Sequence, residues 1–385
     1  MAQTLTFVQR LLDVFPVVQS DLRIQMVFTV APHAFGEGVP QFLHARGIPV
    51  LPWEEAVRSD FDLALAAGWE EIDQVRAPVV LLSHGAGQIK VQRVWNGAAT
   101  EERPPGMLSR DNLTRKGSVV PAAVGLAHRN DLKTLARTCP EAVPVATVLG
   151  DPTYDRLVAS LPHRGAYRAA LGLTEGQKLV VVTATWGQWA SFGALDALLP
   201  RLLTELPGQT YRVAVLTHPN ISAGHGWWQV QTWLSAYHRR GVAVIPPDVD
   251  WRPVMASADW VLGDHGSLTT YATLTPAPIL MVRFPYDKVH RASPAAGLAK
   301  TAPTLFPGHP VEEQLHYAAT EYRRKDYAAI AGQISSAPGR FNERLRRLVY
   351  RMLGIGQPAY PPVTEPVSAP ASLDGWTGKA RGDVA

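Results

Sequence analysis

Short apolar runs recur along the chain and are separated by polar, helix-like stretches. Continuous apolar runs bounded by turn residues are typical of strands buried on both faces, and helical spacers between them indicate a parallel sheet covered by helices. The predicted strands of the first part are Ile24–Val30, Ile48–Leu51, Leu63–Ala67, Pro78–Leu82, Ala122–Leu126 and Val145–Leu149. Those of the second part are Leu179–Thr185, Arg212–Thr217, Val242–Ile245, Trp260–Leu262 and Ile279–Val282.

The break between the two series lies at Gly150-Asp151-Pro152 and is followed by a helical stretch, Arg164–Leu171. We therefore predict an α/β protein with two Rossmann-like domains facing a cleft, an N-terminal domain over 1–150 and a C-terminal domain over 151–310. Such domains bind ligands at the carboxyl ends of their strands.

The C-terminal part has a different pattern. Residues 311–356 are predicted to be helical, and 357–385, where Pro, Ala and Gly are frequent, to be a disordered tail. The last helix, Phe341–Met352, is amphipathic, and five arginines occur from Arg340 to Arg351. Packing of this helix against the domains is preferred over peripheral contact with an anionic membrane, which stays open.

Composition narrows the class of partner. The chain has 385 residues, 46% of them hydrophobic. Its 37 Lys and Arg against 33 Asp and Glu give a net charge of only +4, and these charged residues are dispersed along the sequence. This balance permits an anionic ligand but does not predict nucleic acid. With the single Cys139 and no ligand-spaced His or carboxylate motif, neither a disulfide nor a metal is predicted, and no cofactor is required. No leader or membrane-length apolar segment is visible, so we expect a cytoplasmic protein, of open oligomeric state.

Three predicted strands end in a histidine, and the first of these is His84. It follows Pro78–Leu82 and opens a turn in which Gly85 and Gly87 allow close approach of a ligand to the backbone, with Lys90 beyond them. A histidine at such an edge suits general base catalysis. A histidine that only caps the turn is an equally good interpretation.

The second is His218, in the turn His218-Pro219-Asn220 after Arg212–Thr217. Pro219 stiffens the backbone that carries the imidazole. His-Pro is also an ordinary way to leave a strand, so His218 and Asn220 are site candidates only in combination with the other turns.

The third and strongest signal is the turn after Trp260–Leu262. Hydroxyls and the free amides of a helix start there could bind a phosphate, although Ser267 could equally be an N-cap. The candidate phosphate-binding residues of this turn are Asp264, His265, Gly266, Ser267, Thr269 and Thr270. Thr185 joins them because it ends the first strand of the second domain, just before Trp186 and Trp189, which could stack on a base or sugar or simply pack in the core.

The order of these segments resembles that of the CDP-glycerol glycerophosphotransferases of teichoic acid synthesis. The resemblance rests on His84-Gly85 with Lys90, a hinge at Gly150–Leu157, the His218-Pro219-Asn220 turn and Asp259–Ser267, and spans roughly residues 80 to 285. The last turn is also similar to the HGG-x-x-S/T loop of nucleoside-diphosphate-sugar glycosyltransferases. Both resemblances imply the glycosyltransferase-B (GT-B) fold and a CDP- or UDP-linked donor.

The resemblance implies that His84 activates the acceptor hydroxyl and that His218 contacts the donor diphosphate, while Ser267 and its amide neighbours hold phosphate. The leading hypothesis is therefore a metal-independent transferase of a glycosyl or glycerophosphoryl group. Both families usually have an acidic residue for the ribose after this loop, and none occurs from Thr270 to Pro278. A non-catalytic nucleotide- or sugar-binding protein and a UDP-sugar epimerase of the same fold remain alternatives.

Overall fold

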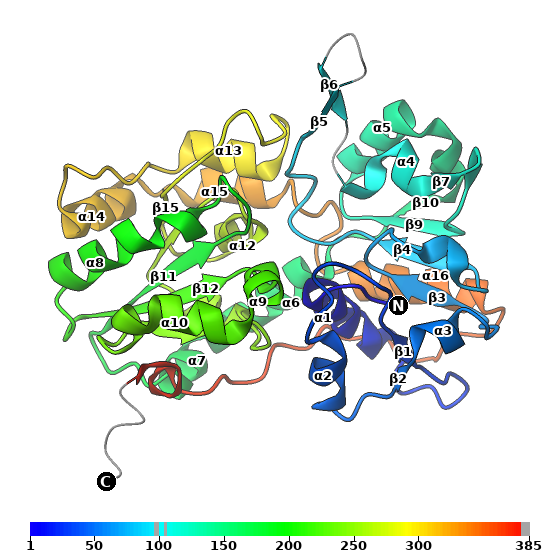
Figure 1. Cartoon of the computed structure of the whole chain (residues 1–385), viewed down its shortest axis with the longest axis horizontal. Coiled ribbons are helices and arrows are strands. Elements are labelled where there is room, and N and C mark those ends of the chain that lie inside the picture. Colours follow the sequence, from blue (N-terminus) through cyan, green and yellow to red (C-terminus); the bar gives the residue numbers. More distant parts are fainter. Residues whose placement is uncertain (96–99, 104–105, 379–385) are drawn as a thin grey trace. The chain divides into compact units, whose positions relative to one another are not determined.

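The computed structural model describes residues 1–95, 100–103 and 106–378 (Figure 1). The chain forms two compact units, each with its own parallel sheet. Unit 1 contains Met1–Arg156 and Gln333–Thr364, and unit 2 contains Leu157–Gly332 and Glu365–Ala385. The prediction of an α/β protein with two Rossmann-like domains is confirmed.

The division of the chain differs from the predicted one at the C-terminal side. The first crossing, after Arg156, lies close to the expected break at 150, but the chain later returns to unit 1 at Gln333 and enters unit 2 again at Glu365. The predicted helical region 311–356 is thus shared between the two units, because its helices pack on different sheets.

The sheet of unit 1 has the parallel strand order β10-β9-β4-β3. Its strands are β3 (Ala64–Ala66), β4 (Val79–Leu82), β9 (Ala123–Leu126) and β10 (Ala146–Val148). A separate parallel pair consists of β1 (Phe28–Thr29) and β2 (Val50–Leu51). Two antiparallel pairs were not predicted: β5 (Gln92–Trp95) with β6 (Thr100–Arg103), and β7 (Thr114–Arg115) with β8 (Ser118–Val119).

The helices of unit 1 cover this sheet. They are α1 (Leu5–Val14), η1 (Phe15–Val17), α2 (Val39–His44), α3 (Trp53–Ala56), η2 (Ile72–Gln74), η3 (Gly106–Leu108), α4 (Arg110–Leu113), α5 (Arg129–Thr138), η4 (Pro140–Val145), the start of α6 (Pro152–Ser160), and α16 (Phe341–Met352). The apolar side of α16, including Leu345 and Val349, is buried with Val80 and Leu82 of β4. The apolar side of this helix is therefore packed in the core of unit 1. This is the arrangement that the sequence analysis preferred over contact with a membrane.

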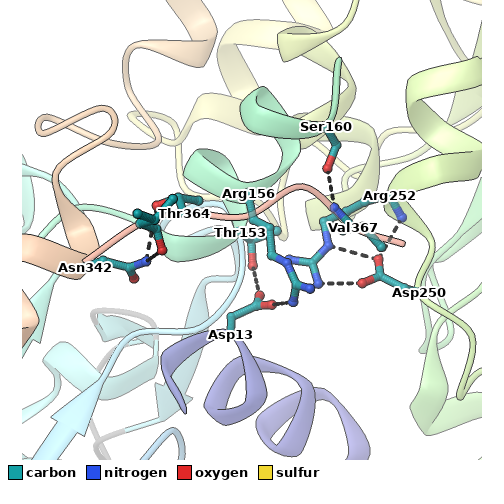
Figure 2. A network of polar contacts seen from close by, with 10 residues as sticks. Asp13, Thr153, Arg156, Ser160, Asp250, Arg252, Asn342, Thr364 and Val367 are labelled. Carbon is teal, nitrogen blue, oxygen red and sulfur yellow. Dashed lines mark hydrogen bonds and ion pairs between the residues drawn. The ribbon is translucent and has the colours of Figure 1, made fainter. Parts of the chain in front are cut away.

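Polar contacts tie α6 to α1 within unit 1. Asp13 accepts hydrogen bonds from Arg156 Nη1 at 2.8 Å and from Thr153 Oγ1 at 3.3 Å (Figure 2). One turn earlier in α1, Arg10 forms a buried ion pair at 3.0 Å with Asp151, the residue just before α6. Both pairs hold the first turn of α6 before the chain leaves unit 1.

The sheet of unit 2 has the parallel order β13-β12-β11-β14-β15. Its strands are β11 (Lys178–Ala184), β12 (Tyr211–Thr217), β13 (Ala243–Ile245), β14 (Trp260–Gly263) and β15 (Ile279–Met281). Numbered along the chain, this is the strand order 3-2-1-4-5 of a Rossmann-like sheet. All strands are parallel, and the order in which they are added reverses between β11 and β14. Ligands of such sheets bind outside the carboxyl ends of the strands at that reversal.

The helices of unit 2 flank this sheet on both faces. They are η5 (Leu161–His163), α7 (Arg164–Ala170), η6 (Ser191–Ala194), α8 (Leu195–Glu205), α9 (Pro219–His225), α10 (Trp227–His238), α11 (Arg252–Ser257), α12 (Ser267–Tyr271), η7 (Ala272–Leu274), α13 (Pro294–Thr301), α14 (Val311–Glu321), α15 (Arg324–Ala331) and η8 (Leu373–Trp376). Asp250 accepts hydrogen bonds from the Arg252 backbone and guanidinium at the start of α11 (Figure 2).

The C-terminal segment was predicted to be disordered from residue 357, and the structure instead gives it fixed partners. Asn342 of α16 donates to Val363 O and Thr364 Oγ1 (Figure 2). In unit 2, Ser160 Oγ accepts from Val367 N at 3.0 Å, and Leu373 is completely buried. Residues 379–385 of the predicted tail lie outside the described residues. Among the described helices, none has the length and apolar character that crossing a bilayer requires.

Candidate functional site

The turn after β4 in unit 1 has a backbone that depends on glycine. Gly85 and Gly87 have φ angles of 76° and 82°, in the left-handed region that residues with a Cβ rarely adopt. Gly87 N donates to Gly85 O at 3.1 Å, which closes the turn. The strand thus delivers His84 to the carboxyl edge of the sheet at the start of a tight turn, as predicted.

The imidazole of His84 is held in one orientation and one tautomer. Its Nδ1 lies 2.9 Å from Ala67 O. A carbonyl oxygen can only accept a hydrogen bond, so Nδ1 carries the proton and Nε2 is the acceptor of the neutral ring. Phe7 and Trp69 lie against the ring, with centroids at 4.5 Å and 6.2 Å.

The surroundings of His84 also favour its neutral form. Burial lowers the pKa of His84 to about 4, and the charges of Arg10 and Lys90 act in the same direction. At neutral pH the ring is therefore unprotonated, which is the state that a general base needs. Lys90, predicted as a ligand-binding residue, is exposed and close enough to His84 to act on its titration.

The second histidine, His218, has the opposite tautomer. It is the N-cap of α9, and its Nδ1 accepts a hydrogen bond from Asn220 N at 3.1 Å. Because Nδ1 accepts, the proton of the neutral ring is on Nε2, which is then a donor. Pro219 occupies the first turn of the helix, and the ring of Trp186 lies 6.0 Å from that of His218.

Asp264 connects two strand ends at the reversal of the unit 2 sheet. Its Oδ2 accepts from Thr185 N at 3.0 Å, from Ser191 N at 2.9 Å and from Ser191 Oγ at 2.7 Å, while Oδ1 accepts from Gly266 N at 2.9 Å. The side chain is 1% exposed. Asp264 and Thr185, both predicted ligand-binding residues, therefore have partners within the protein and together shape the loop after β11.

The remaining predicted phosphate-binding residues divide into two groups. Thr269 Oγ1 is 2.8 Å from Thr183 Oγ1, and Thr270 Oγ1 donates to Gly266 O at 3.2 Å, so both buried hydroxyls are bonded inside unit 2. Gly266 and Ser267 are half-exposed at the start of α12. These two positions keep surface that a ligand can reach.

His265 is almost completely buried and lies edge-on to Phe284, with ring centroids 6.5 Å apart. The helix start expected at this turn is α12, which covers Ser267–Tyr271 before η7 begins.

Sequence reasoning missed two cations beside Trp189. The indole is 45% exposed, with Arg283 Cζ at 6.0 Å and Lys288 Nζ at 5.9 Å from the ring centroid. Arg283 follows β15 by two residues. The strand-end rule that selected the histidines, applied to the last strand of the sheet, would have found it. An exposed indole with cations at its side can stack on a base near a diphosphate.

Among the described residues, no three His, Cys, Asp or Glu side chains lie close enough together to hold a metal ion.

No protein-family model matches the sequence, and no curated protein is similar to it in sequence. Solved structures are similar in fold. A variant of the wall teichoic acid polymerase TagF is 14% identical, with a TM-score of 0.59 over 92% of this chain and 87% of the polymerase chain. Another variant of TagF, soaked with CDPG, is 13% identical, with a TM-score of 0.54 over 80% and 77% of the two chains.

HepE from Anabaena, in complex with UDP-glucose, is 14% identical over 90% of this chain and 95% of its own, but its TM-score of 0.47 carries no argument. At identities this low, structural similarity to the TagF variants establishes the fold alone. Any chemistry has to be argued from the residues of this chain. The fold that the resemblance to the glycerophosphotransferases implied is confirmed.

Proposed function

We propose that this chain, which shares its fold with the wall teichoic acid polymerase TagF, is a transferase that moves a glycosyl or glycerophosphoryl group from a nucleotide-diphosphate donor to a hydroxyl acceptor. The observation that carries the proposal is the pair of opposite tautomers. His84 offers a lone pair on Nε2, and His218 offers a proton on Nε2.

His84 supplies the base. Transfer to an alcohol requires that the hydroxyl lose its proton as the new bond forms, and the neutral imidazole accepts that proton on Nε2. The hydrogen bond from Nδ1 to Ala67 O then stabilises the ring in this orientation, and it persists when the imidazolium forms because Nδ1 keeps its proton.

Unit 2 supplies donor binding. The leaving nucleotide carries growing negative charge on its phosphate, which Nε2–H of His218 and the accessible backbone of Gly266 and Ser267 can stabilise. Trp189, with Arg283 and Lys288 beside it, fits an aromatic base attached to a diphosphate. The CDPG soaked into a TagF variant is a molecule of this class and makes CDP-linked donors the first to test.

The test is turnover by His84→Ala and His218→Ala with a panel of CDP- and UDP-linked donors and simple alcohols as acceptors. His44→Ala and His309→Ala are matched controls, because both side chains are exposed and lie outside the candidate turns. We expect each test variant to lose about 10²-fold or more in kcat and the controls to retain the wild-type rate. Wild-type rates in both test variants would refute the proposal.

A non-catalytic nucleotide-binding protein is the second candidate, favoured by the absence of an acidic residue from Thr270 to Pro278. It predicts calorimetrically measurable binding of CDP, UDP or GDP without turnover in any donor and acceptor combination. An epimerase would instead form product from a UDP-sugar with no acceptor present, so the same assays separate all three.

A further inference from the structure

A cavity of about 370 Å³ lies in unit 1 between α16 and the edge strand β10. It is lined by Thr147 and Val148 of β10, by Leu348, and by four arginines: Arg340, Arg344, Arg347 and Arg351. We call these four residues the arginine row. The volume is in the range of small-molecule sites, and none of the described lining residues is acidic.

The row follows from the helical repeat. Arg344, Arg347 and Arg351 are spaced by three and four residues, so they share one face of α16, and Arg340 precedes that face by one turn. From Arg340 to Arg351 the helix rises about 16 Å. The fifth arginine of the segment, Arg346, is buried and donates to Tyr360 O at 2.6 Å, outside the row.

The positive charge of the row is only partly compensated. Glu343 accepts from Arg340 and Arg347 at 3.0 Å and 2.8 Å and is the acidic partner of the row among the described residues. Arg344 Nη1 donates to Val148 O at 2.8 Å, a carbonyl of the edge strand, which fixes this guanidinium at the cavity wall. No described residue accepts a hydrogen bond from the guanidinium of Arg351.

We propose that the arginine row is a binding site for a compact ligand that carries two or more phosphate groups. Guanidinium groups bind phosphate oxygens in pairs of parallel hydrogen bonds, and several of them along one cavity match several linked phosphates better than a single anion. The site lies wholly in unit 1 and is independent of the proposed transfer reaction.

The burial of the apolar side of α16 favours a small phosphate-containing ligand over a membrane surface as the partner of the arginine row. A helix that lies on a bilayer inserts its apolar side into the lipid. In α16 that side, with Phe341, Leu345 and Leu348, is 4% exposed or less and packed in the core of unit 1. A cavity whose lining is mostly arginine, on a helix whose apolar side is already packed in the core, fits a ligand that enters the cavity better than a bilayer.

The experiment uses the full chain and phenylglyoxal, which modifies accessible arginines, with mass spectrometry of the peptides as a readout for each residue. The probe is inorganic tripolyphosphate, and the control site is Arg137, an exposed arginine of α5 outside the cavity. We expect tripolyphosphate to slow modification of Arg347 and Arg351 but not of Arg137. Calorimetry with the Arg347→Gln, Arg351→Gln double variant should show affinity about tenfold weaker or lower, and Arg137→Gln should match wild type.

Equal modification rates with and without tripolyphosphate would overturn the proposal. So would protection of the row only by vesicles of phosphatidylglycerol and phosphatidylcholine, which would assign it to a membrane. Turnover by the wild-type protein is not involved in either readout, so failure of this proposal and failure of the proposed function are distinguishable.

Discussion

Asp264 binds both the backbone amide and the hydroxyl of Ser191, with its Oδ2 at 2.9 Å and 2.7 Å from the two donors. The same carboxylate oxygen accepts from Thr185 N, so one buried charge fixes both ends of the loop after β11. This loop carries Trp186 and Trp189, and its geometry is therefore set by a residue that follows β14.

Asp264→Asn should destabilise unit 2 and loosen this loop. An amide keeps the shape of the carboxylate but weakens the charge-assisted hydrogen bonds and places NH₂ donors against amide donors, which costs about 2–3 kcal/mol. Urea unfolding followed by tryptophan fluorescence measures the loss. Glu175→Gln, an exposed charge removal in the same unit, should leave stability unchanged. Equal stability of the two variants would contradict the role of Asp264.

Gly263→Ala should also be destabilising, because the space for a methyl group is occupied. A Cβ at Gly263 would lie 2.3 Å from Thr183 Oγ1 and 2.4 Å from Thr269 Oγ1. Relief requires the two threonine side chains to move apart, at a cost of about 1–3 kcal/mol. Gly193→Ala is the matched control, since nothing lies within 4 Å of its Cβ position. Thermal unfolding of both variants gives the comparison.

The pKa of His84, lowered to about 4 by burial, predicts the acid limb of the activity profile. Because the base form persists down to that pH, kcat/KM should fall below about pH 4–5 rather than near the ordinary histidine pKa of about 6.5. A limb near pH 6.5 in otherwise folded protein would argue against His84 as the base.

The same shift affects stability. The unfolded chain protonates His84 near pH 6.5 while the folded protein resists protonation down to about 4, so the contribution of this group to stability is lost as pH falls through that window. Replacement of His84 by Gln should flatten this part of the stability profile in urea titrations.

Asp151→Ala should leave the Arg10 guanidinium buried without its carboxylate partner. The two side chains are 4% and 0% exposed, and removal of one member of such a pair costs about 3–5 kcal/mol. In the same unit, Asp73 and Arg115 form a pair at 3.6 Å with side chains 40% and 38% exposed, so Asp73→Ala should cost less than about 1 kcal/mol. Denaturant titration of both variants tests the contrast.

Trp189→Ala should weaken nucleotide binding and preserve folding, because the indole is largely outside the core. Loss of stacking on a base is worth about 1–3 kcal/mol, or roughly ten- to a hundredfold in Kd. Trp228→Ala, which removes an exposed indole of α10, is the control. Unchanged affinity in the Trp189 variant would remove this residue from the proposed donor site.

The strands could be predicted because their signal is local. A buried parallel strand shows as a continuous apolar run, and β4 and β12 start within one residue of their predicted positions. Where apolar residues are exposed the prediction was too long: Ile24–Val30 contains only the short β1, since Val27 before it is 40% exposed. The short pairs β5–β6 and β7–β8 carry no such run and were missed.

Features that depend on distant partners could not be predicted. Composition indicated disorder after residue 357, yet the backbone amide of Val367 donates a hydrogen bond to the hydroxyl of Ser160, 207 residues earlier. In the candidate site, the strand-end rule located His84, His218 and the turn at Asp264. It could not show that Thr269 bonds to Thr183 or that Asp264 bonds to Ser191, because no spacing along the chain encodes those pairs.

The return of the chain to unit 1 determines the order in which the protein can fold during synthesis. Domains commonly fold as they leave the ribosome, the N-terminal one first. Here the core of unit 1 includes Phe341, Leu345 and Tyr350, so its sheet stays uncovered on that side until the chain has been made through α16. By then every strand of unit 2 has emerged, but Leu373, which is completely buried in the core of unit 2, has not. The core of unit 1 can therefore be completed by α16, and that of unit 2 only by the segment that follows it.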